Sequence, residues 1–470
     1  MSVLGHLASN RVLSIFEELC GIPHGSGNTA AISGWCEAFA KERGLWCHRD
    51  DLGSIIIKKP ASAGYEEHPT VILQAHLDMV CEKAEDLDFN FETDGLSLVL
   101  DGDWLHANGT TLGADDGIGV AIALAVAEDA SLHHPPLEVL LTVDEETGMY
   151  GAEGLDGALL EGRRLINLDT GEDGVFTAGC AGGARVDMTI PVAYEENAMP
   201  CYTVTVDGLQ GGHSGVEIHQ GRTNAPILLG RFLAEQEDVY IVTIEGGCKG
   251  NVIPSEARAI IACDRDLSAA AEAFAVANRT AGDPDLTITV APADEAVQRM
   301  TATATAAVTN FLSTVPNGVV TMSVDMEGLV ETSLNLGVLT TEEQGVHAHI
   351  SVRSSKESEK AALLDRLSLF AAECNACYEE SAHYPGWAFD PASPLRHVLC
   401  DVWAHHSDKS PIVVAVHAGL ECGLFCEKLP GLDAVSVGPT MQDIHTNRER
   451  LNIPSVGKVY SFLCDALAHL

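Results

Sequence analysis

The pattern of hydrophobic and polar residues predicts alternating strands and helices in the first 185 residues. Apolar residues at helical spacing indicate helices, whereas short, continuous apolar runs are typical of buried strands. Helices and a strand of the same kinds return after about residue 395. This alternation predicts an α/β domain, a mostly parallel sheet flanked by helices. Its first elements are helices at 11–21 and 28–44, a strand at 70–77, a helix starting at Asp115, and strands at 137–143 and 164–169.

The pattern changes between about residues 187 and 392. Strands with alternating apolar and polar residues are separated there by three predicted helices, near 224–236, 268–278 and 356–378. We therefore expect an α+β domain, 187–392, inserted into a discontinuous α/β domain made of 1–186 and 393–470. The Cys374–Cys377 pair falls inside the third helix, where helix packing explains it better than zinc.

The chain is strongly acidic. Its 470 residues include 68 Asp and Glu against 27 Lys and Arg, a formal net charge of −41. Such a charge repels nucleic acids and anionic membranes and attracts cations. No apolar stretch is long enough for a membrane span, and the N-terminus does not resemble a signal peptide. With 14 cysteines scattered along the chain, we expect reduced thiols and a cytoplasmic location.

Acidic residues and histidines follow the predicted strands. The carboxyl ends of parallel strands share one edge of a sheet, where ligands bind in α/β proteins. We therefore expect these side chains to converge, joined by one histidine from a turn-rich loop near the C-terminus. They are His76 and Asp78, Asp115 and Asp116, Asp144, Glu145 and Glu146, Asp169, and His445.

Each of these segments also has an ordinary structural explanation. Aspartates are favoured at a helix N-terminus, and acidic pairs are common in solvated turns. Together, however, they predict a two-metal site. His76 and Asp78 face the same way on extended chain, so the aspartate can brace a metal-bound imidazole. Imidazole and carboxylate ligands suit Zn²⁺ best, with Mn²⁺ or Co²⁺ as alternatives.

A set of motifs resembles the co-catalytic zinc peptidases related to carboxypeptidase G, aminoacylase and the carnosine dipeptidases. Within that family, GADDGIGVA, GLQGGHSGVEIHQGRTNA and HAGLECG are most similar to the bacterial aminoacyl-histidine dipeptidases, also called Xaa-His dipeptidases or peptidase D. The resemblance extends from about residue 21 to the C-terminus. The motifs, in order, are QAHLDMV, GADDGIG, DEETGMYGA, NLDTGEDG, GGHSG and DIHT.

The resemblance implies a role for each metal-site residue. One metal would be bound by His76 and Asp169, the other by Glu146 and His445. Asp115 would bridge them. Asp78 would orient the first histidine, and Glu145 would be the general base. The family often has Asn where this chain has Asp116, which we expect to cap the helix rather than bind metal.

The resemblance also implies substrate-binding residues, mostly in the inserted domain, which would act as a lid and dimerisation domain. His213 would stabilise the oxyanion, and Arg353 would bind the substrate carboxylate. Asn251 would face the cleft. His417 and Glu421 would lie near the substrate amine.

The implied activity is hydrolysis of unblocked dipeptides, of the Xaa-His type or a broader range, by a hydroxide bound between two metal ions. The expected partners are a small peptide and a second copy of the chain in a homodimer. An aminoacylase or N-acyl amino acid deacylase would use the same metal site, but HAGLECG favours a free amine. A non-catalytic binding protein with a relic site would have lost a ligand or the base, and none is missing.

Overall fold

The computed structural model describes residues 3–4 and 11–470, which form two compact units. Unit 1 comprises the described residues up to Gly179, together with Phe389–Ala415 and Leu420–Leu470. Unit 2 comprises Cys180–Ala388 and the short segment Val416–Gly419. Each unit has its own sheet and its own hydrophobic core. No helix in the described part of the chain is both long and apolar enough to span a membrane.

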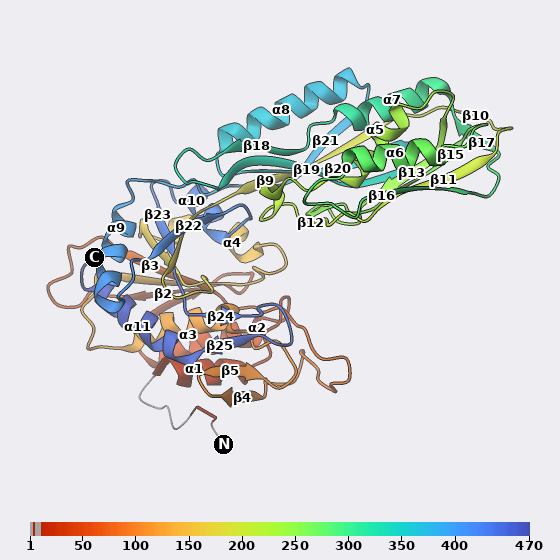
Figure 1. The fold of residues 1–470 in the computed structure, drawn as a ribbon. Helices are drawn as coiled ribbons and strands as arrows, with labels where there is room; N and C mark the ends of the chain where they lie inside the picture. Colours follow the sequence, from red (N-terminus) through yellow and green to blue (C-terminus); the bar gives the residue numbers. More distant parts are fainter. Residues whose placement is uncertain (1–2, 5–10) are drawn as a thin grey trace. The chain divides into compact units, whose positions relative to one another are not determined.

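Unit 1 is built on an eight-stranded sheet of order β1-β2-β6-β3-β7-β23-β8-β22 (Figure 1). Its four central strands, β6, β3, β7 and β23, are parallel, whereas β1, β2 and β8 run antiparallel to their neighbours. This confirms the predicted α/β class. The strands are β1 (Trp46–Arg49), β2 (Ile55–Lys59), β3 (Val71–His76), β6 (Leu137–Thr142), β7 (Arg164–Asn167), β8 (Val175–Cys180), β22 (Ile412–Val416) and β23 (Asp433–Ser436).

The described part of unit 1 also contains seven α-helices and a four-stranded sheet of order β24-β25-β5-β4. Its β24 and β25 flank the predicted His445 loop. The helices are α1 (Arg11–Cys20), α2 (Ala30–Glu42), α3 (Ala114–Glu128), α4 (Tyr150–Gly154), α9 (Pro394–His406), α10 (Glu421–Lys428) and α11 (Ile453–Leu467); the small sheet contains β4 (Leu98–Asp101), β5 (Trp104–Ala107), β24 (Met441–Gln442) and β25 (Arg450–Asn452).

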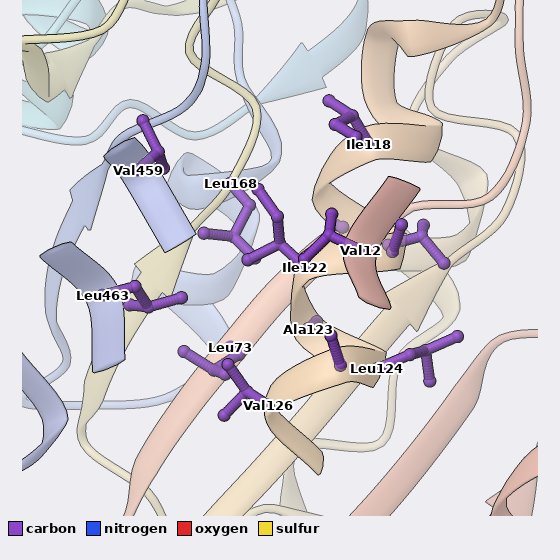
Figure 2. Close-up of a cluster of buried hydrophobic side chains, with 14 of the residues drawn as sticks. Val12, Leu73, Ile118, Ile122, Ala123, Leu124, Val126, Leu168, Val459 and Leu463 are labelled. Atoms are coloured by element: carbon purple, nitrogen blue, oxygen red, sulfur yellow. The ribbon is translucent and has the colours of Figure 1, made fainter. Parts of the chain in front are cut away.

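The unit 1 core explains why α3 is apolar around its whole circumference. Ile118 to Ala127 are all buried, so the helix is enclosed by protein. Side chains of β3 alternate between the two faces of the sheet. Leu73 lies in the same core as Ile122 of α3, with Val12 of α1 and Leu463 of α11 around them (Figure 2). Gln74 contacts α10 instead. The sheet is therefore covered on both faces, with α3 forming the central support of one face.

Unit 2 contains a nine-stranded sheet in which every described pairing is antiparallel. The strand order is β16-β11-β15-β13-β19-β20-β9-β21, with β18 also paired to β19. Four helices share one core with this sheet. Its strands are β9 (Gly182–Ile190), β11 (Cys201–Asp207), β13 (Tyr240–Gly246), β15 (Ala257–Ala262), β16 (Thr287–Pro292), β18 (Gly318–Met322), β19 (Val330–Glu342), β20 (Gly345–Ser354) and β21 (Cys377–Tyr384).

The remaining elements of unit 2 include two short strand pairs, β10 with β17 and β12 with β14. Helix α7 has no counterpart among the three predicted helices. These elements are α5 (Ala225–Ala234), α6 (Ser268–Asn278), α7 (Ala302–Thr314), α8 (Glu357–Glu373), β10 (Tyr194–Glu196), β12 (Gly212–His213), β14 (Val252–Ile253) and β17 (Gln298–Met300).

The predicted helix 356–378 is wrong at its C-terminal end. Helix α8 ends at Glu373, and Asn375 takes a left-handed conformation with φ of 54° that turns the chain into β21. Asn tolerates this conformation better than most residues. Cys374 and Cys377 therefore lie on either side of a helix–strand turn rather than inside a helix.

Candidate metal centre

The predicted ligands of unit 1 converge at the carboxyl edge of its parallel strands. His76 is the last residue of β3, and Asp169 follows the end of β7 by two residues. Glu145 and Glu146 lie in the turn after β6, and Asp115 lies in the first turn of α3. His445 comes from the loop between β24 and β25. The fold thus brings together all five predicted metal ligands and the predicted base.

Asp115 lies between two pairs of predicted ligands. Its Oδ1 is 3.1 Å from Nε2 of His76, and its Oδ2 is 3.1 Å from Nε2 of His445. On the first side, Oδ1 of Asp169 is 3.9 Å from Nε2 of His76. On the second side, Oε1 of Glu146 is 2.7 Å from Nε2 of His445. Each oxygen of Asp115 therefore faces a different candidate position for a cation.

The chemistry of the donors fits metal ions. Three sets of side chains place ligand atoms within 4.8 Å of one another. In the described residues, the ion pairs of Asp115, Glu146 and Asp169 all involve histidine rather than lysine or arginine. The sets are His76 with Asp116 and Asp169, His76 with Glu145 and Glu146, and Asp115 with Glu146 and His445.

The protonation equilibria reflect this crowding of negative charge. Burial, reinforced by Asp115 and Asp116, raises the pKa of Asp169 well above its usual range. Hydrogen bonds with Asp115 and Glu146 raise the pKa of His445 to about 10. Both shifts have the direction expected where buried carboxylates crowd together without a cation to neutralise them.

Asp78 binds backbone more closely than it binds the imidazole. Nδ1 of His76 is 3.0 Å from the carbonyl oxygen of Asp78 and 3.6 Å from its Oδ1. The carboxylate accepts hydrogen bonds from the N–H groups of Glu145 and Glu146, at 3.0 and 3.3 Å, and from the Ser26 hydroxyl, at 2.8 Å. Asp78 therefore fixes the tautomer of His76 through its carbonyl and the Glu145–Glu146 turn through its side chain.

The prediction that Asp116 caps the helix is wrong. The N-cap residue of α3 is Gly113, which has no side chain to cap the helix. Asp116 is fully buried, and its Oδ2 accepts a hydrogen bond from the backbone N–H of His76 at 3.2 Å. It braces the end of β3, because backbone angles in the first turn of α3 depart from helical values and redirect the side chain.

A buried polar layer beneath the ligands was not predicted from the sequence. Gln74 Nε2 donates to Glu421 Oε2 at 2.6 Å, and Thr142 Oγ1 donates to the same oxygen at 2.9 Å. Asn167 Nδ2 donates to Gln74 Oε1 at 2.5 Å. Gln74 precedes His76 by two residues, and Asn167 precedes Asp169 by two. Each side chain therefore points to the same face of the sheet as the candidate ligand that follows it. That spacing is the only sign of them in the sequence.

Glu421, expected near the substrate amine, is the first residue of α10 and is 3% exposed. Burial and the charge of Glu145 raise the pKa of its carboxyl to about 8. Its Oε1 has no hydrogen-bond partner among the described residues.

Four of the predicted site residues belong to unit 2. His213, on the two-residue strand β12, pairs with Val252 of β14. Its Nδ1 accepts hydrogen bonds from the N–H groups of Gly215 and Val216, both at 3.1 Å. The neutral ring must therefore carry its proton on Nε2, which leaves an N–H donor. Asn251 is exposed, and its carbonyl accepts from Ser214 N–H at 2.9 Å.

Arg353 and His417 lie near His213 within unit 2. Burial, together with the charge of Arg353, lowers the pKa of His417 to about 3, so its imidazole is neutral. His417 Nε2 lies 2.7 Å from Ser333 Oγ. Arg353 donates from one terminal nitrogen to the Tyr384 hydroxyl at 3.1 Å. Arg353 thus carries a positive charge beside the neutral polar groups of His213, His417 and Tyr384. Such a cluster favours the binding of an anion.

Comparison with known proteins identifies the relatives of this chain. Cytosol non-specific dipeptidase of Escherichia coli is 39% identical over 100% of this chain and 99% of its own length. Aminoacylhistidine dipeptidase of Vibrio alginolyticus superposes with a TM-score of 0.94 at 37% identity, covering 100% and 98% of the two chains.

More distant structures share the fold. Aminopeptidase PepT of Bacillus cereus has a TM-score of 0.56 at 16% identity, over 97% of each chain. The model of peptidase family M20/M25/M40 matches residues 72–469. This chain therefore belongs to peptidase family M20/M25/M40.

Proposed function

We propose that this protein is a metal-dependent dipeptidase that hydrolyses unblocked dipeptides, of the Xaa-His type or a broader range. The observation that carries the proposal is the position of Asp115 between two pairs of ligands. It is supported by the full-length similarity to two dipeptidases, one of which is named for the cytosol. A cytoplasmic location and a homodimer are part of the same proposal.

In this proposal His76 and Asp169 would hold one metal ion, Glu146 and His445 would hold the other, and Asp115 would be shared between them. The mixed imidazole and carboxylate donors favour Zn²⁺, with Mn²⁺ or Co²⁺ as alternatives. When bound, such ions lower the pKa of a water molecule and polarise a carbonyl group.

Glu145 is the proposed general base. Burial and the neighbouring carboxylates Glu146 and Asp115 raise its pKa to about 7, against a partial opposing effect of His76. A carboxylate whose pKa lies near the working pH accepts a proton and gives it up again with little cost in either direction. We propose that Glu145 takes the proton from water and delivers it to the leaving amine.

His213 is the proposed oxyanion donor. Its Nε2–H is free of the backbone hydrogen bonds that hold Nδ1, so it can donate to a developing negative charge without losing an existing partner. Burial and the charge of Arg353 lower its pKa, which keeps the ring neutral and its tautomer fixed.

The two ends of the substrate need opposite charges. Arg353 is the proposed partner of the carboxylate, with Asn251 as a further polar contact. Glu421 and His417 are proposed to act near the amine, where the carboxyl of Glu421 offers an oxygen without a hydrogen-bond partner among the described residues.

The proposed activity is tested with a substrate panel of unblocked dipeptides, including carnosine and other Xaa-His peptides, N-acetylated amino acids and tripeptides, with Zn²⁺, Mn²⁺ or Co²⁺ added. We expect unblocked dipeptides to be cleaved with kcat/KM at least about tenfold above the other two classes, which corresponds to roughly 1.4 kcal/mol of discrimination. Preference for N-acetylated substrates would identify an aminoacylase, and a metal-loaded protein without turnover would identify a binding protein.

Asp115→Ala should release both metal ions, whereas His445→Ala should first weaken one. A bridging carboxylate offsets charge on two cations, and its loss leaves them repelling each other across a short gap. Metal content after dialysis, measured by mass spectrometry, checks this. Asp443→Asn changes an exposed residue of the same loop and should retain the wild-type content. Identical loss of a single ion in both variants would contradict the bridge.

Glu145→Gln should keep the metal content and the fold but lower kcat by roughly two to four powers of ten, because an amide of the same shape cannot accept the proton. Steady-state kinetics on the best dipeptide, with metal analysis of the same sample, measures the effect. Glu153→Gln alters an exposed glutamate of α4 and serves as the control. A fully metal-loaded variant with wild-type kcat would exclude Glu145 as the base.

His213→Ala should lower kcat by roughly two to three powers of ten, as loss of an oxyanion donor does. Metal content should stay unchanged. His219→Ala, at an exposed position of the same segment, is the matched control. If kcat of His213→Ala equals that of the control, the oxyanion role is wrong.

A further inference from the structure

The carboxylate of Glu449 binds the backbone around Asp115 through hydrogen bonds. It is 2% exposed, and it lies four residues after His445, at the end of the loop between β24 and β25. Both of its carboxylate oxygens accept backbone hydrogen bonds from the segment 112–115. Oε2 accepts from Leu112 at 2.8 Å and Gly113 at 3.0 Å, and Oε1 accepts from Ala114 at 2.8 Å and Asp115 at 3.3 Å.

These four N–H groups lie at the N-terminus of α3, where a helix leaves its first N–H groups without internal partners. The usual remedy is a local capping side chain, but the N-cap residue here is Gly113, in a left-handed conformation with φ of 64°. Glu449 supplies the acceptors from 334 to 337 positions away in the sequence. The conformation of this turn therefore depends on a remote carboxylate.

The backbone of Asp115 is not held by the helix itself. Its φ and ψ of −84° and 105° lie outside the helical range. The loop that carries His445 and Glu449 thus contacts the segment around Asp115 in two places. One contact is made by the N–H groups that donate to Glu449, and the other joins His445 Nε2 and Asp115 Oδ2 at 3.1 Å. A shift of Glu449 would move both partners of the second contact relative to each other.

We infer that Glu449 is a positioning residue that sets the geometry of the metal position formed by Asp115, Glu146 and His445. The inference rests on the metal assignment proposed above. The four N–H groups occupy the carboxylate of Glu449, so it is not itself a ligand and acts by fixing the Asp115 segment relative to His445. Its loss should weaken this metal position more than the one formed by His76 and Asp169.

The test is a metal titration of the full-length protein, independent of catalysis. The metal-free protein is titrated with Zn²⁺ or Co²⁺ against a competing chelator, and the dissociation constants of both positions are compared among variants. In Glu449→Gln an NH₂ group replaces one oxygen and faces two N–H donors. Glu449→Asp keeps both acceptors and the charge but is one methylene shorter. Glu138→Gln is the matched control: Glu138 is also 2% exposed and accepts backbone N–H bonds from Glu161 and Gly162.

We expect Glu449→Gln to weaken one metal position by about 10- to 100-fold, the usual effect of removing a group that orients a ligand, and to leave the other within a few-fold of wild type. Glu449→Asp should weaken the same position by a smaller factor. Glu138→Gln should lower the thermal midpoint without changing either dissociation constant.

Three outcomes overturn the inference. The first is unchanged metal binding in a folded Glu449→Gln. The second and third are equal weakening of both metal positions in Glu449→Gln and equal weakening of both in Glu138→Gln. Should Glu449→Gln fail to fold, Glu449→Asp decides by the same criterion. A wild-type protein that binds fewer than two ions would instead refute the metal assignment, so the two failures are distinguishable.

Discussion

The electrostatic repulsion among five carboxylates is the constraint on which the rest of the site depends. Asp115, Asp116, Glu145, Glu146 and Asp169 lie together at one edge of the unit 1 sheet. The Asp116 side chain is fully buried, and those of Glu146, Asp115 and Asp169 are only 9%, 13% and 17% exposed. Buried charge of one sign is costly unless a partner compensates it. Two imidazoles supply at most two positive charges. Burial and hydrogen bonds in the rest of the fold therefore hold these carboxylates close together, an arrangement that bound cations would make favourable.

Much of this arrangement follows from local sequence patterns. The buried strands β3, β6 and β7 are short apolar runs, and α3 is a long one, so their order predicts a parallel sheet and the edge at which its strands end. The ligands follow these strands directly. For that reason His76, Glu146 and Asp169 could be assigned to one edge from sequence alone, with His445 joined to them from a turn-rich loop, whereas the division of these residues between two metal ions relied on resemblance to a family.

The contacts that position the ligands were not predictable in the same way. Glu421 joins Gln74 across 347 residues, and Glu449 joins Leu112 across 337. Nothing in a local pattern distinguishes such a glutamate from a solvated one. The prediction for Asp116 was wrong for a related reason. The residues around it suggest a helix cap, but the first turn of α3 has non-helical backbone angles and directs the Asp116 carboxylate to the N–H of His76. The end of α8 was missed because a left-handed Asn375, rather than a glycine or proline, stops the helix.

Five of the acidic residues of the site fall into two groups by what they bind. Asp115, Glu146 and Asp169 face imidazoles, while Asp78 and Glu449 have their carboxylates filled by backbone N–H groups of the segments that carry those ligands. The N–H bonds that such a carboxylate accepts offset part of the cost of its burial without a cation, so the second group adds less demand for positive charge than unpaired carboxylates would. Each member of this group ties one ligand segment to another: Asp78 connects the end of β3 to the Glu145–Glu146 turn, and Glu449 connects the His445 loop to Asp115. Hydrogen bonds to the backbone thus fix the relative positions of the proposed ligands, and the repulsion among the first group favours a cation between them.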